Sequence, residues 1–111
     1  MALTVRTHDG PGVRAATIAL AGDLDAPGGK IARKALSGTI AEGRTDVTVN
    51  LDRVGFLDSS GLGSLIAALR LARDRGGDVR VETSNERIRR ILEVTALARV
   101  FKLRRSNEIA A

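Results

Sequence analysis

The side chains best suited to chemistry in this 111-residue sequence are an aspartate and two adjacent serines, Asp58, Ser59 and Ser60. Serine and aspartate favour the position just before a helix, because their oxygens accept the free backbone amides of its first turn. The start of a helix also carries a partial positive charge and tolerates an anion well. One of the three is therefore predicted to cap a helix, and a phosphate on Ser59 or Ser60 would be accepted without unfolding.

Two glycines follow the serines inside the first turn of this predicted helix, at Gly61 and Gly63. Each costs about 1 kcal/mol of helix stability relative to alanine. Because glycine lets another backbone come close, this cost is explained if another backbone approaches the turn. Leu62 begins an apolar stripe that is expected to pack mainly in the core, with one edge of the helix available to the partner.

Few other residues are candidates for catalysis or metal binding. The only histidine, His8, falls in a predicted turn, so a Ser-His-Asp arrangement has no obvious base. The sequence contains no G-x-x-x-x-G-K-[ST] loop, and no G-x-G-x-x-G follows a predicted strand. The only close pair of carboxylates, Asp23 and Asp25, precedes a predicted helix that Asp25 can cap. The sequence thus predicts no enzyme, no cofactor and no metal site.

The periodicity of apolar residues predicts the elements that must position the serines. Strands are expected at 3–7, 13–21, 47–51, 79–81 and 100–103. Helices are expected after Asp25, from about Ser60, and after a capping box at Thr83–Glu86, with one or two helical turns at 106–111. This alternation predicts an α/β fold: an opening hairpin and a mixed, mainly parallel sheet of four to five strands with helices packed on it.

Composition and length limit the class of protein. The 111 residues, 43% of them apolar and 28% charged, fit one soluble domain over 1–111. No apolar run approaches the roughly 20 residues that cross a bilayer, and the first residues lack the features of a signal peptide. The absence of cysteine excludes disulfides and thiolate metal sites. We therefore expect a cytoplasmic protein without a membrane span.

The formal net charge of +5 comes entirely from residues 70–111, which carry eleven Lys/Arg against six Asp/Glu. Such a half could bind nucleic acid or anionic lipid through Arg87, Arg89 and Arg90. Acids are interspersed among these bases, however, and the chain has only two aromatic residues, too few for a stacking platform. Direct nucleic-acid binding is therefore the less favoured alternative, and the oligomeric state is left open.

The segment Phe56–Gly63 resembles the phosphorylation motif of bacterial anti-sigma factor antagonists of the STAS family. Gly22–Asp25 is similar to the Gly-Glu-Leu-Asp segment of that family, with Asp23 in place of the commoner glutamate. Further similarity runs in the same order over nearly the whole chain, at Val47–Asp52, Gly76-Gly77, Arg89–Leu97 and Val100-Phe101. Pro27–Gly29 departs from the family, which usually has small or apolar residues there. The resemblance implies a STAS fold.

The resemblance also implies a mechanism of partner switching. The unmodified protein would bind an anti-sigma factor that is also a serine kinase, and so release the sigma factor. The kinase would then phosphorylate the first serine of the motif, Ser59, with Ser60 as the second choice, and the complex would dissociate. A serine phosphatase of the PP2C type would reset the switch. ATP and Mg²⁺ would belong to these partners.

In this scheme Asp58 would orient Ser59, and Ser60 could cap the helix. Asp23, Asp25 and Asn50 would supply polar surroundings. Gly61 and Gly63 would let the backbone of the partner approach, and Leu62 lies between them. The main alternative is a STAS domain without a sigma factor in its circuit, a structural subunit of a stress-sensing assembly or of a lipid-transport complex. Such a subunit could carry the same fold and a similar serine loop.

Overall fold

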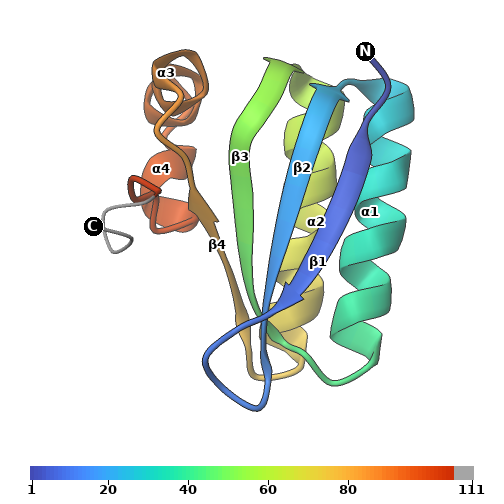
Figure 1. Ribbon diagram of the computed structural model, residues 1–111. Helices are drawn as coiled ribbons and strands as arrows, with labels where there is room; N and C mark the ends of the chain where they lie inside the picture. The colour runs from blue at the N-terminus through green and yellow to red at the C-terminus, as the bar shows by residue number, and fades with distance from the viewer. Residues whose placement is uncertain (107–111) are drawn as a thin grey trace.

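The computed structural model describes residues 1–106, which form one mixed β-sheet with helices packed on it (Figure 1). The four strands lie in the order of the chain: β1 (Thr4–Asp9), β2 (Ala15–Leu24), β3 (Asp46–Leu57) and β4 (Asp78–Glu82). β1 is antiparallel to β2, while β2, β3 and β4 run parallel. The predicted hairpin and the mainly parallel sheet are thus confirmed.

Two helices of 16 residues each, α1 (Ala26–Ala41) and α2 (Ser59–Asp74), lie side by side on one face of the sheet (Figure 1). Two shorter helices, α3 (Glu86–Val94) and α4 (Leu97–Val100), lie on the β4 side. β2 leads directly into α1 and β3 leads into α2. Because parallel strands end at the same edge of a sheet, both long helices begin at that edge.

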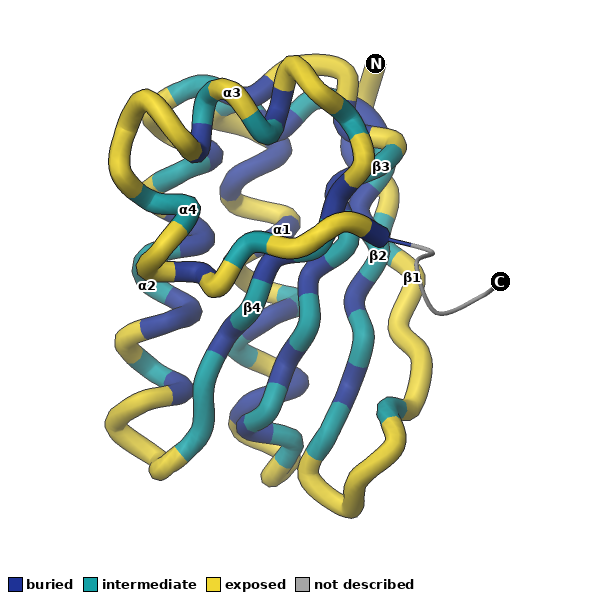
Figure 2. The backbone as a smooth tube through the Cα atoms, turned by 90° about the vertical axis from the view of Figure 1, so that its left-hand side faces the viewer, coloured by how far each residue is buried: buried dark blue, intermediate teal, exposed yellow. Residues whose placement is uncertain are grey.

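The core lies between the sheet and the two long helices. Burial alternates along the strands, as a sheet with one packed face requires (Figure 2). The fully buried members on the helix side include Ile18 and Leu20 of β2 and Val47, Val49 and Leu51 of β3, the last three as predicted. The side chains between them point to the opposite face, which is polar and half-buried.

β3 is longer than the predicted strand 47–51, because pairing with β2 continues to Leu57. The register with β2 shifts twice, between Ala19 and Ala21 and between Gly22 and Asp23. The simple alternation of apolar residues is lost over this stretch. Because of this irregular register, the pattern of apolar residues does not predict the second half of β3, which ends at Leu57, directly before Asp58.

The predicted strand at 100–103 is wrong. α4 ends at Val100, and Lys102 adopts a left-handed conformation with φ of 49°. Phe101 is fully buried, so its apolar character reflects anchoring in the core rather than strand alternation. The chain then runs beside β4 with backbone hydrogen bonds but forms only an isolated bridge, between Glu82 and Arg104. Of the helical turns expected at 106–111, residues 107–111 lie outside the described part of the chain.

The capping box predicted at Thr83–Glu86 is also wrong. The N-cap of α3 is Asn85, whose Oδ1 accepts the amides of Arg87 at 3.1 Å and Ile88 at 3.5 Å. The Thr83 hydroxyl is instead directed to Asp52 of β3, to which it donates at 3.1 Å. A long-range partner has therefore taken the side chain that the local pattern assigned to the helix.

Asp52 collects further donors, and we call this group the Asp52 cluster (Asp52, Thr83, Ser84 and Ser106). The backbone amide of Ser84 donates to Asp52 Oδ1 at 2.8 Å, and the Ser106 hydroxyl lies 2.6 Å from Oδ2. Burial alone would raise the pKa of Asp52, but hydrogen bonds from Ser106, Ser84, Thr83 and Asn50 hold it below its ordinary value. The cluster ties residue 106 to the middle of the sheet.

Candidate functional site

Ser59 is the first residue of α2 and stands at the edge of the sheet where β2 and β3 end. It is exposed, and its hydroxyl forms no hydrogen bond with any of residues 1–106. We call this place the serine edge (Asp58, Ser59 and Ser60). A hydroxyl that is exposed and unengaged is available to an incoming group.

Asp58 is the N-cap of α2. Its Oδ1 accepts the backbone amides of Ser60 at 3.0 Å and Gly61 at 3.1 Å. The expectation that Ser60 caps the helix is therefore wrong. Nor does Asp58 hydrogen-bond the Ser59 hydroxyl: its carboxylate holds the backbone of the turn from which Ser59 projects. Asp58 thus acts on Ser59 through the backbone.

Asp23 and Asp25 lie at the same edge as Ser59. Asp23 is paired with Phe56 in the register of β2 and β3, and the Asp58 amide donates to the Leu24 carbonyl at 3.4 Å. Asp25 caps α1 by accepting the Gly28 amide at 2.9 Å, as predicted. The three aspartates at positions 23, 25 and 58 therefore surround the start of the two long helices with negative charge.

The Asp23 carboxylate is engaged by the amino group of Met1. The two groups lie 2.6 Å apart and form an ion pair. The hydrogen bond and charge of Asp23 raise the pKa of the Met1 amino group. The Asp23 side chain remains 33% exposed to solvent at the serine edge.

Asn50 does not belong to the serine edge, contrary to the prediction. Its side-chain amide donates to Asp52 Oδ2 at 3.3 Å and to Glu82 Oε2 at 3.0 Å, on the polar face of the sheet. Alternation along β3 turns Asn50 away from the helices, because Val49 and Leu51 face them. It also lies eight residues before Asp58, roughly 25 Å along an extended strand.

The two glycines of the motif have different surroundings. Gly61 is buried, and a Cβ there would overlap the Leu24 carbonyl oxygen. The backbone that approaches Gly61 thus belongs to this chain, and the expectation that a partner requires this glycine is wrong. Gly63 is exposed, and nothing lies within 4 Å of a Cβ built at that position. Leu62, between them, is half-buried and packs against the core.

Phe56 gives the serine edge an apolar flank that sequence reasoning did not assign. Its side chain is 49% exposed, although it lies in β3 only three residues before Ser59. It lines a shallow cavity of about 170 Å³ with Ile91 and Arg87 of α3. An exposed aromatic beside an unengaged serine offers apolar area to a partner. The sequence signal was present, since Phe56 directly precedes the Leu-Asp-Ser-Ser motif.

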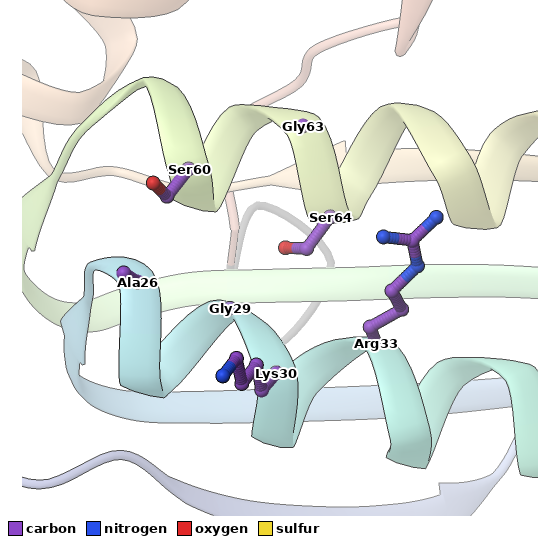
Figure 3. A pocket seen from close by; sticks show the side chains of 7 residues that line it. All are labelled: Ala26, Gly29, Lys30, Arg33, Ser60, Gly63 and Ser64. Atoms are coloured by element: carbon purple, nitrogen blue, oxygen red, sulfur yellow. The ribbon is translucent and has the colours of Figure 1, made fainter.

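On the other side, a cleft of about 300 Å³ separates the first turns of α1 and α2 (Figure 3). It is lined by Ala26, Gly29, Lys30, Arg33, Ser60, Gly63 and Ser64. Lys30 and Arg33 are exposed and form no ion pair with residues 1–106. Sequence reasoning also missed this basic flank, because helix spacing places both bases on one face but does not reveal which neighbour that face meets.

Within residues 1–106, no three His, Asp or Glu side chains are placed to hold a metal ion. Among these same residues, no helix combines the length and the apolar character that crossing a membrane requires.

Comparison with known proteins gives a family and several relatives. The family model described as "Mlab, STAS domain" matches residues 11–105. The anti-sigma-B factor antagonist of Bacillus subtilis is 27% identical over 89 residues, which are 80% of this chain and 81% of that protein.

Two solved structures share the fold. An anti-sigma factor antagonist from Mycobacterium paratuberculosis superposes with a TM-score of 0.80 at 24% identity, over 92% of this chain and 85% of that one. The Bacillus cell fate determinant SpoIIAA in its phosphorylated form gives a TM-score of 0.73 at 20% identity, over 96% and 95% of the two chains. Because the family model covers most of the sequence and these structures share its α/β architecture, the chain belongs to the STAS domain family.

Proposed function

We propose that this protein is an anti-sigma factor antagonist that works in the cytoplasm. In its unmodified form it binds an anti-sigma factor that is also a serine kinase, and thereby frees a sigma factor. The names of the Bacillus subtilis and Mycobacterium paratuberculosis relatives support this class of function. The same kinase phosphorylates Ser59 and so ends its own binding, and a PP2C-type serine phosphatase restores the unmodified form.

The observation that carries the proposal is the unengaged hydroxyl of Ser59 on a rigid helix start. The Asp58 cap fixes the backbone from which Ser59 projects, and the packing of Gly61 against Leu24 fixes the next turn. The backbone of Ser59 therefore keeps one position, and its exposed hydroxyl needs no local unfolding to meet a kinase. Phe56 beside it supplies apolar area for a partner that must bind before it modifies.

Charge explains why phosphorylation would release the partner. Phosphoserine adds about −1.5 to −2 charges at neutral pH. On Ser59 this charge joins Asp23, Asp25 and Asp58 at one edge, so an interface suited to a neutral serine acquires like-charge repulsion and a desolvation cost. Each loss of about 1.4 kcal/mol weakens binding tenfold. A related fold has been solved in a phosphorylated form, which supports a switch that keeps the fold intact.

Intact-mass spectrometry with site mapping tests the proposal, on protein isolated from its own cells before and after phosphatase treatment. One removable phosphate on Ser59 and co-purification with an anti-sigma factor are expected. No phosphate under several growth conditions, together with co-purification of membrane transporter subunits or a stress-sensing assembly, would favour the alternative of a structural STAS subunit. A phosphate on Ser60 alone would retain the mechanism but make Ser60 the switch residue in place of Ser59.

A further inference from the structure

The cleft between α1 and α2 differs in charge from the rest of the serine edge. Arg33 reaches from α1 toward α2 at the level of Ser64, and Lys30 lies one turn earlier on α1 (Figure 3). Neither base is neutralised by an ion pair within the described residues 1–106. Two positive charges at the wall of one small cleft would stabilise an anion that entered it.

Small residues keep this cleft open. Gly29 packs tightly against α2, since a Cβ there would lie 3.2 Å from the Ser60 carbonyl oxygen. Gly63 also lines the cleft, but a Cβ there would have nothing within 4 Å, and Ala26 contributes only a methyl group. Glycine at position 63 costs the helix about 1 kcal/mol relative to alanine, and the packing of residues 1–106 does not explain this cost.

The two serines face this cleft differently. Successive residues of a helix are rotated by about 100°. Ser60 lines the cleft and lies on the side of α2 that faces α1, whereas Ser59 is not among the lining residues (Figure 3). Both share the Asp58 cap and the start of α2. Ser60 thus shares the lining of this cleft with Lys30 and Arg33, and Ser59 does not.

We propose that the α1–α2 cleft is a phosphate-binding subsite that holds a phosphoryl group carried by Ser60, with Lys30 and Arg33 as its cationic partners. The inference deepens the proposed function and rests on it for the donor. Transfer of the γ-phosphoryl group of ATP would form a bond from phosphorus to Ser60 Oγ and break the bond to the β–γ bridging oxygen. ADP leaves, and the hydroxyl proton passes to a base of the kinase.

The adjacent serines are then two distinct modification sites. A phosphate on Ser59 adds uncompensated negative charge to the surface that meets the partner. A phosphate on Ser60 brings about two negative charges to two positive ones, so the net charge of that surface changes little. Modification of Ser60 should therefore release the partner less than modification of Ser59 does.

The test uses the full chain alone, with phosphoserine incorporated genetically at position 60 or at position 59. The phosphate is followed by ³¹P NMR during a pH titration, in which an unperturbed phosphoserine titrates near about 6. We expect the pKa of the phosphate on Ser60 to lie about 0.5 to 1 below that on Ser59, because two cations favour the dianion. The double substitution Lys30→Gln, Arg33→Gln should abolish the difference.

Lys34→Gln is the matched control. Lys34 is an exposed base of α1 that lines a different groove, beside β1. It should leave the difference between the two phosphates intact. Equal pKa values at the two positions, or a difference that survives the double substitution, would overturn the proposal. Because no partner is present, this failure is distinct from a failure of the Ser59 switch, which is measured by binding.

A second measurement covers the case in which a phosphate at position 60 prevents folding. A double-mutant cycle combines Ser60→Glu with Arg33→Gln and follows urea unfolding. Glutamate at 60 and Arg33 should stabilise each other by about two- to fivefold in the unfolding equilibrium constant. Ser59→Glu with Arg33→Gln provides the comparison and should show no coupling. Absence of coupling at position 60 would contradict an anion subsite in the cleft.

Discussion

The serine edge and the Asp52 cluster combine the same kinds of side chain, a carboxylate with neighbouring hydroxyls. The carboxylate of the cluster lies within β3, and that of the serine edge lies just past the end of β3. In the Asp52 cluster the carboxylate accepts the hydroxyls of Thr83 and Ser106 directly. At the serine edge, Asp58 accepts only backbone amides and leaves the Ser59 hydroxyl unengaged. The difference shows that a modifiable serine depends on where the nearby carboxylate is directed, rather than on the residue types present.

Burial follows the same division. Thr83 and Ser106 are 0% and 4% exposed, and no buried side-chain polar atom in residues 1–106 lacks a hydrogen-bond partner. Satisfied polar groups in a buried position add stability, whereas exposed groups at a capped helix start add little. Substitutions in the Asp52 cluster should therefore affect folding, and those at Ser59 should affect binding.

Ser59 substitutions should produce the largest change, and in binding alone. Ser59→Glu places a carboxylate beside Asp58 and should weaken binding to the anti-sigma factor about 100-fold or more. Ser59→Ala should bind as the unmodified protein does and resist release by ATP. Isothermal titration calorimetry measures both, and urea unfolding should give the same midpoint within error. Equal binding by both variants would mean that the switch residue has been misassigned.

Asp52→Ala should cost about 2 to 3 kcal/mol of unfolding free energy, because it leaves several partly buried donors without an acceptor. Asp46→Ala is the control: Asp46 lies on the same face of β3, and its carboxylate forms no hydrogen bond or ion pair within residues 1–106. That change should stay within about 0.5 kcal/mol. Urea unfolding measures both, and similar losses would show that the Asp52 cluster contributes nothing special.

Asp58→Ala should cost about 1 kcal/mol through loss of the α2 cap, and Asp58→Asn should recover most of it, since asparagine caps equally well. Thermal unfolding provides the comparison. If the alanine variant loses as much stability as Asp52→Ala, then Asp58 holds more than two amides, and the contrast between the two sites is weaker than the hydrogen bonds indicate.

The smallest effect is on the pH dependence of stability. The pKa of Asp52 is lower in the folded protein than its ordinary 3.8, so its contribution is fully present above that value and is lost as the pH falls through the folded pKa. Unfolding free energies measured from neutral pH to about pH 2 should therefore show a gap between wild type and Asp52→Asn that narrows below pH 3.8. A gap independent of pH would exclude this contribution.

Asp78 should also contribute to the loss of unfolding free energy at low pH. Burial alone would raise its pKa, but hydrogen bonds from Lys102 and the Val79 amide, with the charges of Lys102 and Arg73, lower it. Its stabilisation is likewise lost as the pH falls, so some decline should remain in Asp52→Asn. Lys102→Gln should weaken that remaining decline.

Sequence reasoning located the fold and the start of α2 because both depend on local patterns. The alternation of apolar residues at Val47, Val49 and Leu51 predicts a strand. Asp58 is one of the few residue types that cap helices. The same alternation could have excluded Asn50, which lies between two core-facing residues. Its assignment to the site rested on family resemblance and overlooked the two-residue period of the strand.

The features that were missed depend on contacts between distant parts of the chain. Thr83 was assigned to a local cap, but its partner Asp52 lies 31 residues away. Lys30 and Arg33 enter the site only because α1 lies beside α2. A single sequence shows which residues share a helix face without showing what that face meets, so the basic flank emerges only when the two helices are packed.

Gly61 and Gly63 look interchangeable in the motif, yet they would leave opposite traces in a library of variants. A selection for folding alone should purge every substitution at Gly61, where the Leu24 carbonyl occupies the space of a side chain. The same selection should accept alanine at Gly63 and even enrich it, because the helix gains up to about 1 kcal/mol. Only a selection that also requires the partner could restore glycine at position 63.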